Sequence, residues 1–339
     1  GGLPWAGVAA SPGAMQQGSS RIRVAAGVAV GLAGAAIVAL YLRRRQRSTR
    51  LRVSKLAIYP IKGCKGVRVP SAKVLEEGLE HDREFMIVRP GGGGLWEFVS
   101  QRQIPGIALI EPSVPSADGA LEVRAPGMPP LTVRPPGEGA NRVQLNIWGD
   151  AAEGLDCGDA AAAWLCELLQ APGLRLLRHA GVRRIDEAFA KGRTMFSDGF
   201  PLLVTTEASL ADVEAASGLG RPFERFRPNL VLEGAGRYAE DAASGIVCSA
   251  GGAGVRLRFV KPCARCQVPA VDPATGSRGR DPLPAIKPYR SGKILASQAT
   301  AHPEHYQTHR GEIFFGQNAV PELGTGQNVV SEGDDVAWM

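Results

Sequence analysis

Beyond residue 50, short apolar segments rich in Val, Ile and Leu alternate with clusters of Gly and Pro. Short strands separated in this way are typical of β-barrels and β-sandwiches, and not of doubly wound sheets. We therefore predict a mixed α/β fold that is rich in β-structure. The predicted strands are residues 53–59, 84–88, 95–99, 107–110, 120–124, 131–133, 143–147, 174–178, 229–233 and 255–260.

Four consecutive glycines, residues 91–94, separate two of these predicted strands. A phosphate-binding loop of the Walker type would be followed by Lys, then Ser or Thr, and then a helix. None of these follows here, so the glycines predict a hairpin turn.

Two segments have the spacing of amphipathic helices. The first is residues 159–170, and the second is residues 207–217, which follows the cap candidates Thr205 and Thr206 and stops at Gly218. Between them, residues 183–193 are polar and mixed in charge. We expect a domain junction there, with one domain at residues 51–184 and the other at residues 185–339.

Before the predicted strands, residues 24–42 form a run of 19 residues without a charge. As a helix this run would span about 28 Å, close to the hydrocarbon thickness of a bilayer. Two arginines precede it and six follow it, namely Arg21, Arg23, Arg43, Arg44, Arg45, Arg47, Arg50 and Arg52. We predict a single transmembrane helix within a membrane anchor at residues 21–50, after a disordered segment at residues 1–20. A cleaved targeting or transit peptide is the alternative.

The charge distribution supports this interpretation. The chain has a net charge of +6, but no acidic residue precedes Glu76, and the 75 residues before it carry +13. The rest of the chain is therefore net acidic, which argues against nucleic acid as a partner. The larger cluster of arginines follows the apolar run, which places the body on the cytosolic side of a membrane. An anchor in the mitochondrial outer membrane has this character.

Six cysteines are present, and two of them form a C-x-x-C pair, Cys263 and Cys266, with Lys261 and Arg265 close by in the sequence. Nearby cations favour the thiolate, which is the form that binds a metal or attacks as a nucleophile. A cytosolic body would not be expected to hold disulfides.

Three interpretations of this pair compete. A structural zinc site needs four ligands, but the partner cluster His302, His305 and His309 begins only after a gap of 35 residues. For these histidines a solvated loop is the default expectation. A thioredoxin-like redox pair should open a helix, which the neighbouring prolines disfavour. The third possibility is a single thiolate ligand for a soft metal.

Four segments in the same order resemble the mitochondrial amidoxime-reducing component family of MOSC-domain molybdenum enzymes. The resemblance extends from about residue 53 to the C-terminus. The segments are residues 58–66 (IYPIKGCKG), 78–88 (GLEHDREFMIV), 226–231 (FRPNLV) and 262–276 (PCARCQVPAVDPATG).

The resemblance implies a MOSC-type β-barrel domain preceded by a β-rich MOSC N-terminal domain. It also implies a molybdenum cofactor, with Cys266 as the protein's ligand to molybdenum. A thiolate suits such a metal, and we expect Lys261 and Arg265 to help hold it deprotonated. The cofactor is expected to be bound by Lys62, Gly63, Arg83, Asp198, Gly199, Phe200, Arg227, Asn229, Ala264, Arg265 and Asn318.

Two positions depart from the family pattern. The family often has serine where this chain has Gly63, so a side-chain contact there is lost or becomes a backbone contact. Near the C-terminus the family has Phe-Gly-Gln-Tyr, and this chain has Asn318 in place of the tyrosine. The tyrosine contact to the cofactor is therefore in question.

By resemblance, the protein reduces N-hydroxylated compounds such as amidoximes, hydroxylamines and N-oxides, and also nitrite to nitric oxide. We find no convincing flavin, nicotinamide or haem motif in the sequence. Electrons are therefore expected from cytochrome b5 and its NADH-dependent reductase, as in the family. The alternative is a non-catalytic carrier of the molybdenum cofactor.

Overall fold

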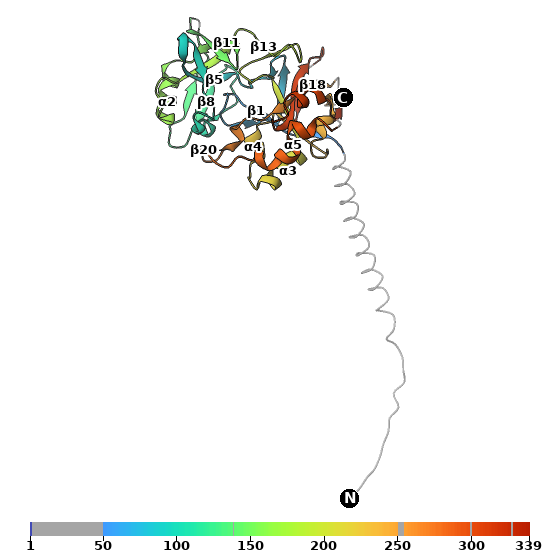
Figure 1. Ribbon diagram of the computed structural model, residues 1–339. Coiled ribbons are helices and arrows are strands. Elements are labelled where there is room, and N and C mark those ends of the chain that lie inside the picture. Colours follow the sequence, from blue (N-terminus) through green and yellow to red (C-terminus); the bar gives the residue numbers. More distant parts are fainter. Residues whose placement is uncertain (2–49, 138, 250–253, 299, 327) are drawn as a thin grey trace. The chain divides into compact units, whose positions relative to one another are not determined.

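The computed structural model describes residue 1 and residues 50–339, apart from residues 138, 250–253, 299 and 327 (Figure 1). The predicted disordered segment and the predicted anchor lie outside the described residues, except for their end residues Gly1 and Arg50. Within the described part of the chain, no helix is long and apolar enough to cross a membrane.

The first half of the body folds into a closed barrel with the strand order β10-β11-β12-β5-β6. Along β10 every second side chain, Val143, Leu145 and Ile147, is buried, which is the two-residue period of a strand with one face toward a core. The barrel strands are β5 (Phe85–Pro90), β6 (Trp96–Phe98), β10 (Arg142–Ile147), β11 (Asp150–Asp156) and β12 (Arg175–Ala180).

A second sheet of eight strands has the order β16-β15-β21-β18-β17-β23-β1-β2, and an additional pairing of β16 with β1 closes it on itself. Strand β1 comes from the start of the body, yet its partners β16 and β23 come from the C-terminal half. The strands are β1 (Arg52–Ile58), β2 (Val67–Arg68), β15 (Leu202–Thr206), β16 (Leu230–Glu233), β17 (Gly245–Ser249), β18 (Val255–Ala264), β21 (Phe314–Glu322) and β23 (Asp335–Trp338).

Small sheets and short helices complete the body. The small sheets are β7 (Glu111–Pro112) with β8 (Leu121–Arg124) and β9 (Leu131–Val133), β22 (Val329–Ser331) with β3 (Ser71–Leu75) and β4 (Gly78–Leu79), β13 (Arg183–Arg184) with β14 (Arg193–Thr194), and β19 (Val271–Asp272) with β20 (Ser277–Arg278). The 3-10 helices are η1 (Gly92–Gly94), η2 (Pro105–Leu109), η3 (Ala239–Ala242) and η4 (Val268–Ala270).

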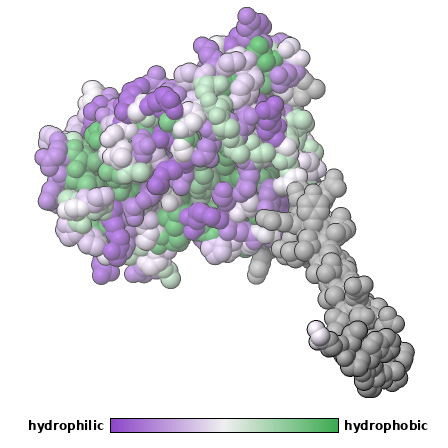
Figure 2. Space-filling model, turned by 90° about the horizontal axis from the view of Figure 1, so that it is seen from below, coloured by the Kyte–Doolittle hydropathy of each residue, from purple (hydrophilic) through white to green (hydrophobic). Residues whose placement is uncertain are grey.

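The α-helices pack on the outside of the barrels. Figure 1 shows α2 beside the first barrel, and α3, α4 and α5 gathered on another side of the body. On the face in Figure 2, hydrophilic side chains surround small hydrophobic areas, as on most folded proteins. The helices are α2 (Asp159–Leu169), α3 (Glu207–Ser217), α4 (Pro222–Phe226), α5 (Leu283–Arg290), α6 (Gly292–Leu295) and α7 (Pro303–Thr308).

Most of the predicted elements are confirmed. Both predicted helices form, and the glycines at residues 91–94 connect the antiparallel strands β5 and β6. The predicted strand at residues 107–110 is wrong, because this buried apolar segment folds mainly as the 3-10 helix η2. A short apolar run that is buried on all sides has no periodicity that would distinguish the two.

Helix α3 begins at the N-cap Thr206, whose hydroxyl oxygen accepts a hydrogen bond from the backbone N–H of Ser209. We expect Thr206→Ala to lower the free energy of unfolding by about 1–2 kcal/mol, because the cap is lost inside the protein. Urea denaturation measures this loss. The exposed Thr132→Ala is the control, and an equal effect of the two substitutions would contradict the role of the cap.

Candidate functional site

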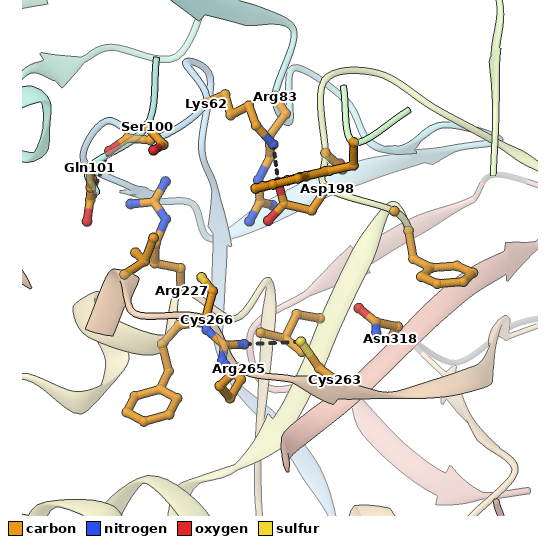
Figure 3. A pocket seen from close by; sticks show the side chains of 18 of the residues that line it. Lys62, Arg83, Ser100, Gln101, Asp198, Arg227, Cys263, Arg265, Cys266 and Asn318 are labelled. Atoms are coloured by element: carbon orange, nitrogen blue, oxygen red, sulfur yellow. Dashed lines mark hydrogen bonds and ion pairs between the residues drawn. The ribbon is translucent and has the colours of Figure 1, made fainter. Parts of the chain in front are cut away.

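An open pocket with about 930 Å³ of empty space lies where the two barrels meet (Figure 3). The first barrel contributes Phe98 and Trp148, and the second contributes Leu203, Cys263 and Asn318. Residues of both barrels therefore form the lining of this pocket.

Five cationic side chains line this pocket, namely Lys62, Arg83, Arg102, Arg227 and Arg265. They come from five separate segments: the loops after β1, β4, β6 and β18, and the C-terminal end of α4. Arg83 and Arg227 have positive φ angles of 52° and 58°. This conformation is unfavourable for a side chain of this size, and such strain is concentrated at functional sites.

Arg83 is held by neighbours on several sides. Its Nη1 pairs with the buried carboxylate of Asp82 and donates to Oδ1 of Asn229 at 3.0 Å. Its guanidinium lies over the ring of Tyr59, 4.3 Å from the centroid. Burial raises the pKa of Asp82, and the adjacent Arg83 partly offsets that rise. These contacts fix the guanidinium in one orientation at the pocket wall.

Arg227 packs on the same tyrosine ring, with its guanidinium carbon 4.2 Å from the centroid of Tyr59. Its Nη1 donates to the backbone oxygen of Cys64 at 2.6 Å. Burial lowers the pKa of Arg227 to about 10, so the group is still a cation at neutral pH. Both guanidinium groups are thus held against one aromatic ring, and each favours an anion as its partner in the pocket.

Lys62 and Asp198 form an ion pair across the pocket, with Nζ 2.5 Å from Oδ1. The same oxygen accepts a hydrogen bond from Nε1 of Trp148 at 3.0 Å. The side chain of Asp198 is 68% exposed at the pocket. Desolvation in the pocket would raise its pKa, but Lys62 and the hydrogen bond from Trp148 bring the pKa well below its usual range. Burial lowers the pKa of Lys62, and Asp198 opposes that effect. Asp198 is therefore ionised at every physiological pH.

A buried arginine supports the loop that carries Asp198. Arg183 donates to the backbone oxygens of Ser197 at 2.6 Å and Asp198 at 2.8 Å, and it pairs with Asp150 at 2.9 Å. The loop residues of the pocket are thus anchored to the hairpin of the first barrel.

Both cysteines of the C-x-x-C pair line the pocket, Cys266 exposed and Cys263 partly buried. Nη1 of Arg265 lies 3.3 Å from Sγ of Cys263 (Figure 3). Lys261 lies over the ring of Phe189, 4.4 Å from the centroid. Arg265 thus bonds the other thiol of the pair, and the expectation that these two cations help hold Cys266 deprotonated stays a prediction. Burial raises the pKa of Cys263, and Arg265 partly offsets that rise.

All of the predicted site residues except Ala264 line this pocket. Ala264 is exposed at the end of β18, where it pairs with Phe314 of β21. Ala264 thus lies outside the pocket lining, between Cys263 and Arg265, and its cofactor-binding role stays a prediction. The chemical roles of the other residues stay predictions at this point.

Several pocket residues were missed by the sequence analysis, among them Phe98, Gln101, Arg102 and Trp148. The sequence does carry a sign that Trp148 is unusual. The Trp-Gly pair at residues 148–149 follows a predicted strand, at a position where a hairpin turn commonly has Asn-Gly or Asp-Gly. Gln101 donates to the backbone oxygen of Gly63 at 2.6 Å, a contact that local sequence does not reveal.

The histidines at residues 302–309 do not form the solvated loop that was expected. His305 is only 6% exposed within α7, and its ring stacks on His309 at 4.3 Å between centroids. Over the described residues, no group of three His, Cys, Asp or Glu side chains is arranged to hold a metal ion.

The pocket has the donor set that a molybdenum cofactor requires. Five cationic side chains line it, and Asp198 is the one carboxylate among its described lining residues. Nε of Arg265 is buried and has no hydrogen-bond partner among the described residues. The exposed thiol of Cys266 adds a soft ligand. An anionic group with a thiophilic metal fits these residues.

Two known domain families match this chain, and several known proteins are similar to it. The MOSC N-terminal beta barrel domain matches residues 50–172, and the MOSC domain matches residues 191–337. Mitochondrial amidoxime-reducing component 1 of Mus musculus is 33% identical, over 77% of this chain and 80% of its own. Mitochondrial amidoxime reducing component 2 of Bos taurus is 32% identical, over 73% and 75%.

A third relative is larger. Molybdenum cofactor sulfurase of Drosophila grimshawi is 29% identical over 75% of this chain, which spans only 32% of that protein. The two domain matches together cover most of the described body, and the amidoxime-reducing components align over most of their length. The chain therefore belongs to the mitochondrial amidoxime-reducing component family of MOSC-domain proteins.

Proposed function

We propose that this protein is a molybdenum-cofactor-dependent reductase of N-hydroxylated compounds, namely amidoximes, hydroxylamines and N-oxides. The observation that carries the proposal is the convergence of five cationic side chains and one exposed thiol in a single pocket between the barrels. The names of the relatives agree with this chemistry, since they describe amidoxime-reducing components and a molybdenum cofactor sulfurase.

The residues divide into two roles in this proposal. Cys266 would bind molybdenum through its thiolate, and the guanidinium groups of Arg83, Arg227 and Arg265 would bind the phosphate and pterin through charge-assisted hydrogen bonds. When bound, the cofactor supplies a two-electron redox centre that accepts oxygen from N–O bonds.

The chain's own groups would orient the substrate. Asp198 is ionised at neutral pH, so it accepts hydrogen bonds and does not deliver a proton. An amidoxime presents N–H donors that match this carboxylate. Lys62 holds the carboxylate in place through the ion pair between them. The pocket is open, so solvent water can reach a bound substrate and supply the protons of the reduction.

We further propose that electrons come from cytochrome b5 and its NADH-dependent reductase, and that nitrite is a second substrate. The protein would be anchored in the mitochondrial outer membrane with its body in the cytosol. The apolar run at residues 24–42, the flanking arginines and the mitochondrial relatives support this location.

The decisive experiment combines elemental analysis with turnover of an amidoxime in a reconstituted electron chain. Near-stoichiometric molybdenum with turnover supports the reductase. Molybdenum without turnover, together with transfer of the cofactor to a molybdenum-free apoenzyme, would instead identify a carrier. Zinc in place of molybdenum would refute both functions.

The contribution of Arg83 can be tested separately. We expect Arg83→Gln to weaken cofactor retention by about 10-fold, since a hydrogen bond to a charged group contributes about 1.5–3 kcal/mol. Molybdenum per protein after dialysis measures this loss. Arg89→Gln is the matched control, because Arg89 is partly exposed on β5 outside the pocket lining. Unchanged retention in Arg83→Gln would remove its binding role.

A further inference from the structure

Strands β10 and β11 are joined by a two-residue turn, Trp148-Gly149, in which both residues have positive φ angles, 56° and 103°. Hairpin turns of this kind favour Asn-Gly or Asp-Gly, because bulky side chains are strained at positive φ. A tryptophan at the first position is therefore costly for the fold. Strain of this sort is maintained where a side chain is needed at one point in space.

The contacts of Trp148 show where it is needed. Its Nε1 donates to Asp198 at 3.0 Å, and its ring meets Phe98 edge to face, with centroids 5.1 Å apart. The side chain of Asn146 accepts a hydrogen bond from the backbone N–H of Gly149 at 2.7 Å and holds the turn. Trp148 is nevertheless 54% exposed, although it lines the pocket. The indole is thus oriented firmly while a large part of its surface faces solvent.

The indole already binds a flat, delocalised group. The guanidinium carbon of Arg102 lies over it, 4.7 Å from the ring centroid. An amidoxime head and an aryl ring are likewise flat π-systems, and they stack on indole for the same electrostatic and dispersion reasons. Asp198, at the edge of the same indole, accepts hydrogen bonds from N–H groups.

From this arrangement, and resting on the proposed function, we infer that Trp148 is a specificity-determining residue. It forms a stacking subsite at the pocket mouth that selects N-hydroxylated substrates carrying a flat aromatic group over small alkyl ones. The subsite belongs to the N-terminal barrel, whereas Cys266 and Asp198 belong to the second half of the chain.

The test compares benzamidoxime with acetamidoxime on the molybdenum-loaded protein. Trp148→Asn suits the turn and removes the ring, and we expect it to lower the benzamidoxime-to-acetamidoxime ratio of kcat/KM by about 10-fold. Trp148→Phe keeps an aromatic face and loses the indole N–H. We expect this variant to retain the ratio to within about 3-fold.

Trp338→Ala is the matched control, because Trp338 is an exposed tryptophan on β23 outside the pocket lining. It should leave the ratio unchanged. An equal loss for both substrates in Trp148→Asn, or an unchanged ratio, would overturn the inference. If the loss of kcat/KM in Trp148→Asn changed with the electron donor and not with the substrate, Trp148 would act in partner docking. That result would also overturn the inference.

Calorimetry separates this inference from the proposed function. Benzamidine should bind the parent protein more tightly than acetamidine, and Trp148→Asn should remove that preference. If the parent holds molybdenum but reduces no amidoxime, the proposed function fails while the calorimetric preference still supports the subsite. If the parent shows no preference for benzamidine, the subsite fails whatever the turnover.

Discussion

Replacing Cys266 by alanine is expected to lower N-reductive turnover by at least about 100-fold while the protein folds normally. Removing a residue that only supports a metal ligand already lowers metal affinity or activity by about 10- to 100-fold. Removing the ligand itself should lower them further. The side chain of Cys266 is exposed, so its loss creates no cavity in the core. Turnover with a reconstituted electron chain, molybdenum per protein and the thermal midpoint measure the three parts of this expectation.

Cys263→Ala is the matched control for this experiment. Cys263 lies three residues earlier, lines the same pocket and bonds Arg265. Burial raises the pKa of its thiol, which disfavours the thiolate, and the thiol already bonds Arg265, so its variant should keep molybdenum. Full activity in Cys266→Ala would refute the ligand assignment, and so would an equal loss in both variants.

The fold was predictable where burial alternates along a strand. Strand β10 is the clearest case, since it has one face toward the barrel core. Strand β21 was missed because its sequence contains Gly316, with a φ of 76°, and the polar Gln317 and Asn318. Gln317 is buried through a hydrogen bond to Asp241, which lies 76 residues away. Only the tertiary pairing with β15 and β18 makes this segment a strand.

The candidate site was predictable only where a segment carries its own signal. The segments around Lys62, Arg83, Arg227 and Cys266 are such cases, and the structure gathers them in one pocket. Trp148 enters the pocket because the first barrel closes and brings a turn against Asp198, 50 residues away. Sequence spacing does not encode this proximity.

The directions of side chains could not be predicted from the sequence either. Lys261 and Arg265 both stand near Cys266 in the sequence, but one lies on Phe189 and the other bonds Cys263. Proximity along the chain therefore does not show which side chain a cation contacts.

A buried carboxylate outside the pocket leads to the second large expected effect. Glu240 lies in η3 and is fully buried, and it accepts hydrogen bonds from Thr205 at 2.8 Å and Ser209 at 3.0 Å. Burial raises its pKa from 4.5 to about 7, and the neighbouring charge of Asp241 adds to the rise. The folded protein thus favours the neutral acid, whereas the unfolded chain releases this proton at lower pH.

The sign of the pH dependence follows from this difference. A raised pKa in the folded state contributes stability that is fully present below pH 4.5 and is lost as the pH rises through 7. At pH 8 the loss amounts to about 3 kcal/mol, since each unit of pKa corresponds to about 1.4 kcal/mol. Glu240→Gln is similar in shape and cannot ionise, so its stability relative to the parent should grow by about 2–3 kcal/mol between pH 5 and pH 8.

Urea denaturation of Glu240→Gln at the two pH values measures this gain. Glu214→Gln is the matched control, because it makes the same change from carboxylate to amide at an exposed position on α3. An equal effect of Glu240→Gln at both pH values would mean that the amide alters packing or hydrogen bonding instead of titration. The gain in stability of Glu240→Gln would also be absent if the ionised carboxylate of Glu240 formed an ion pair in the parent protein. A cation beside it would then stabilise the charged form inside the fold.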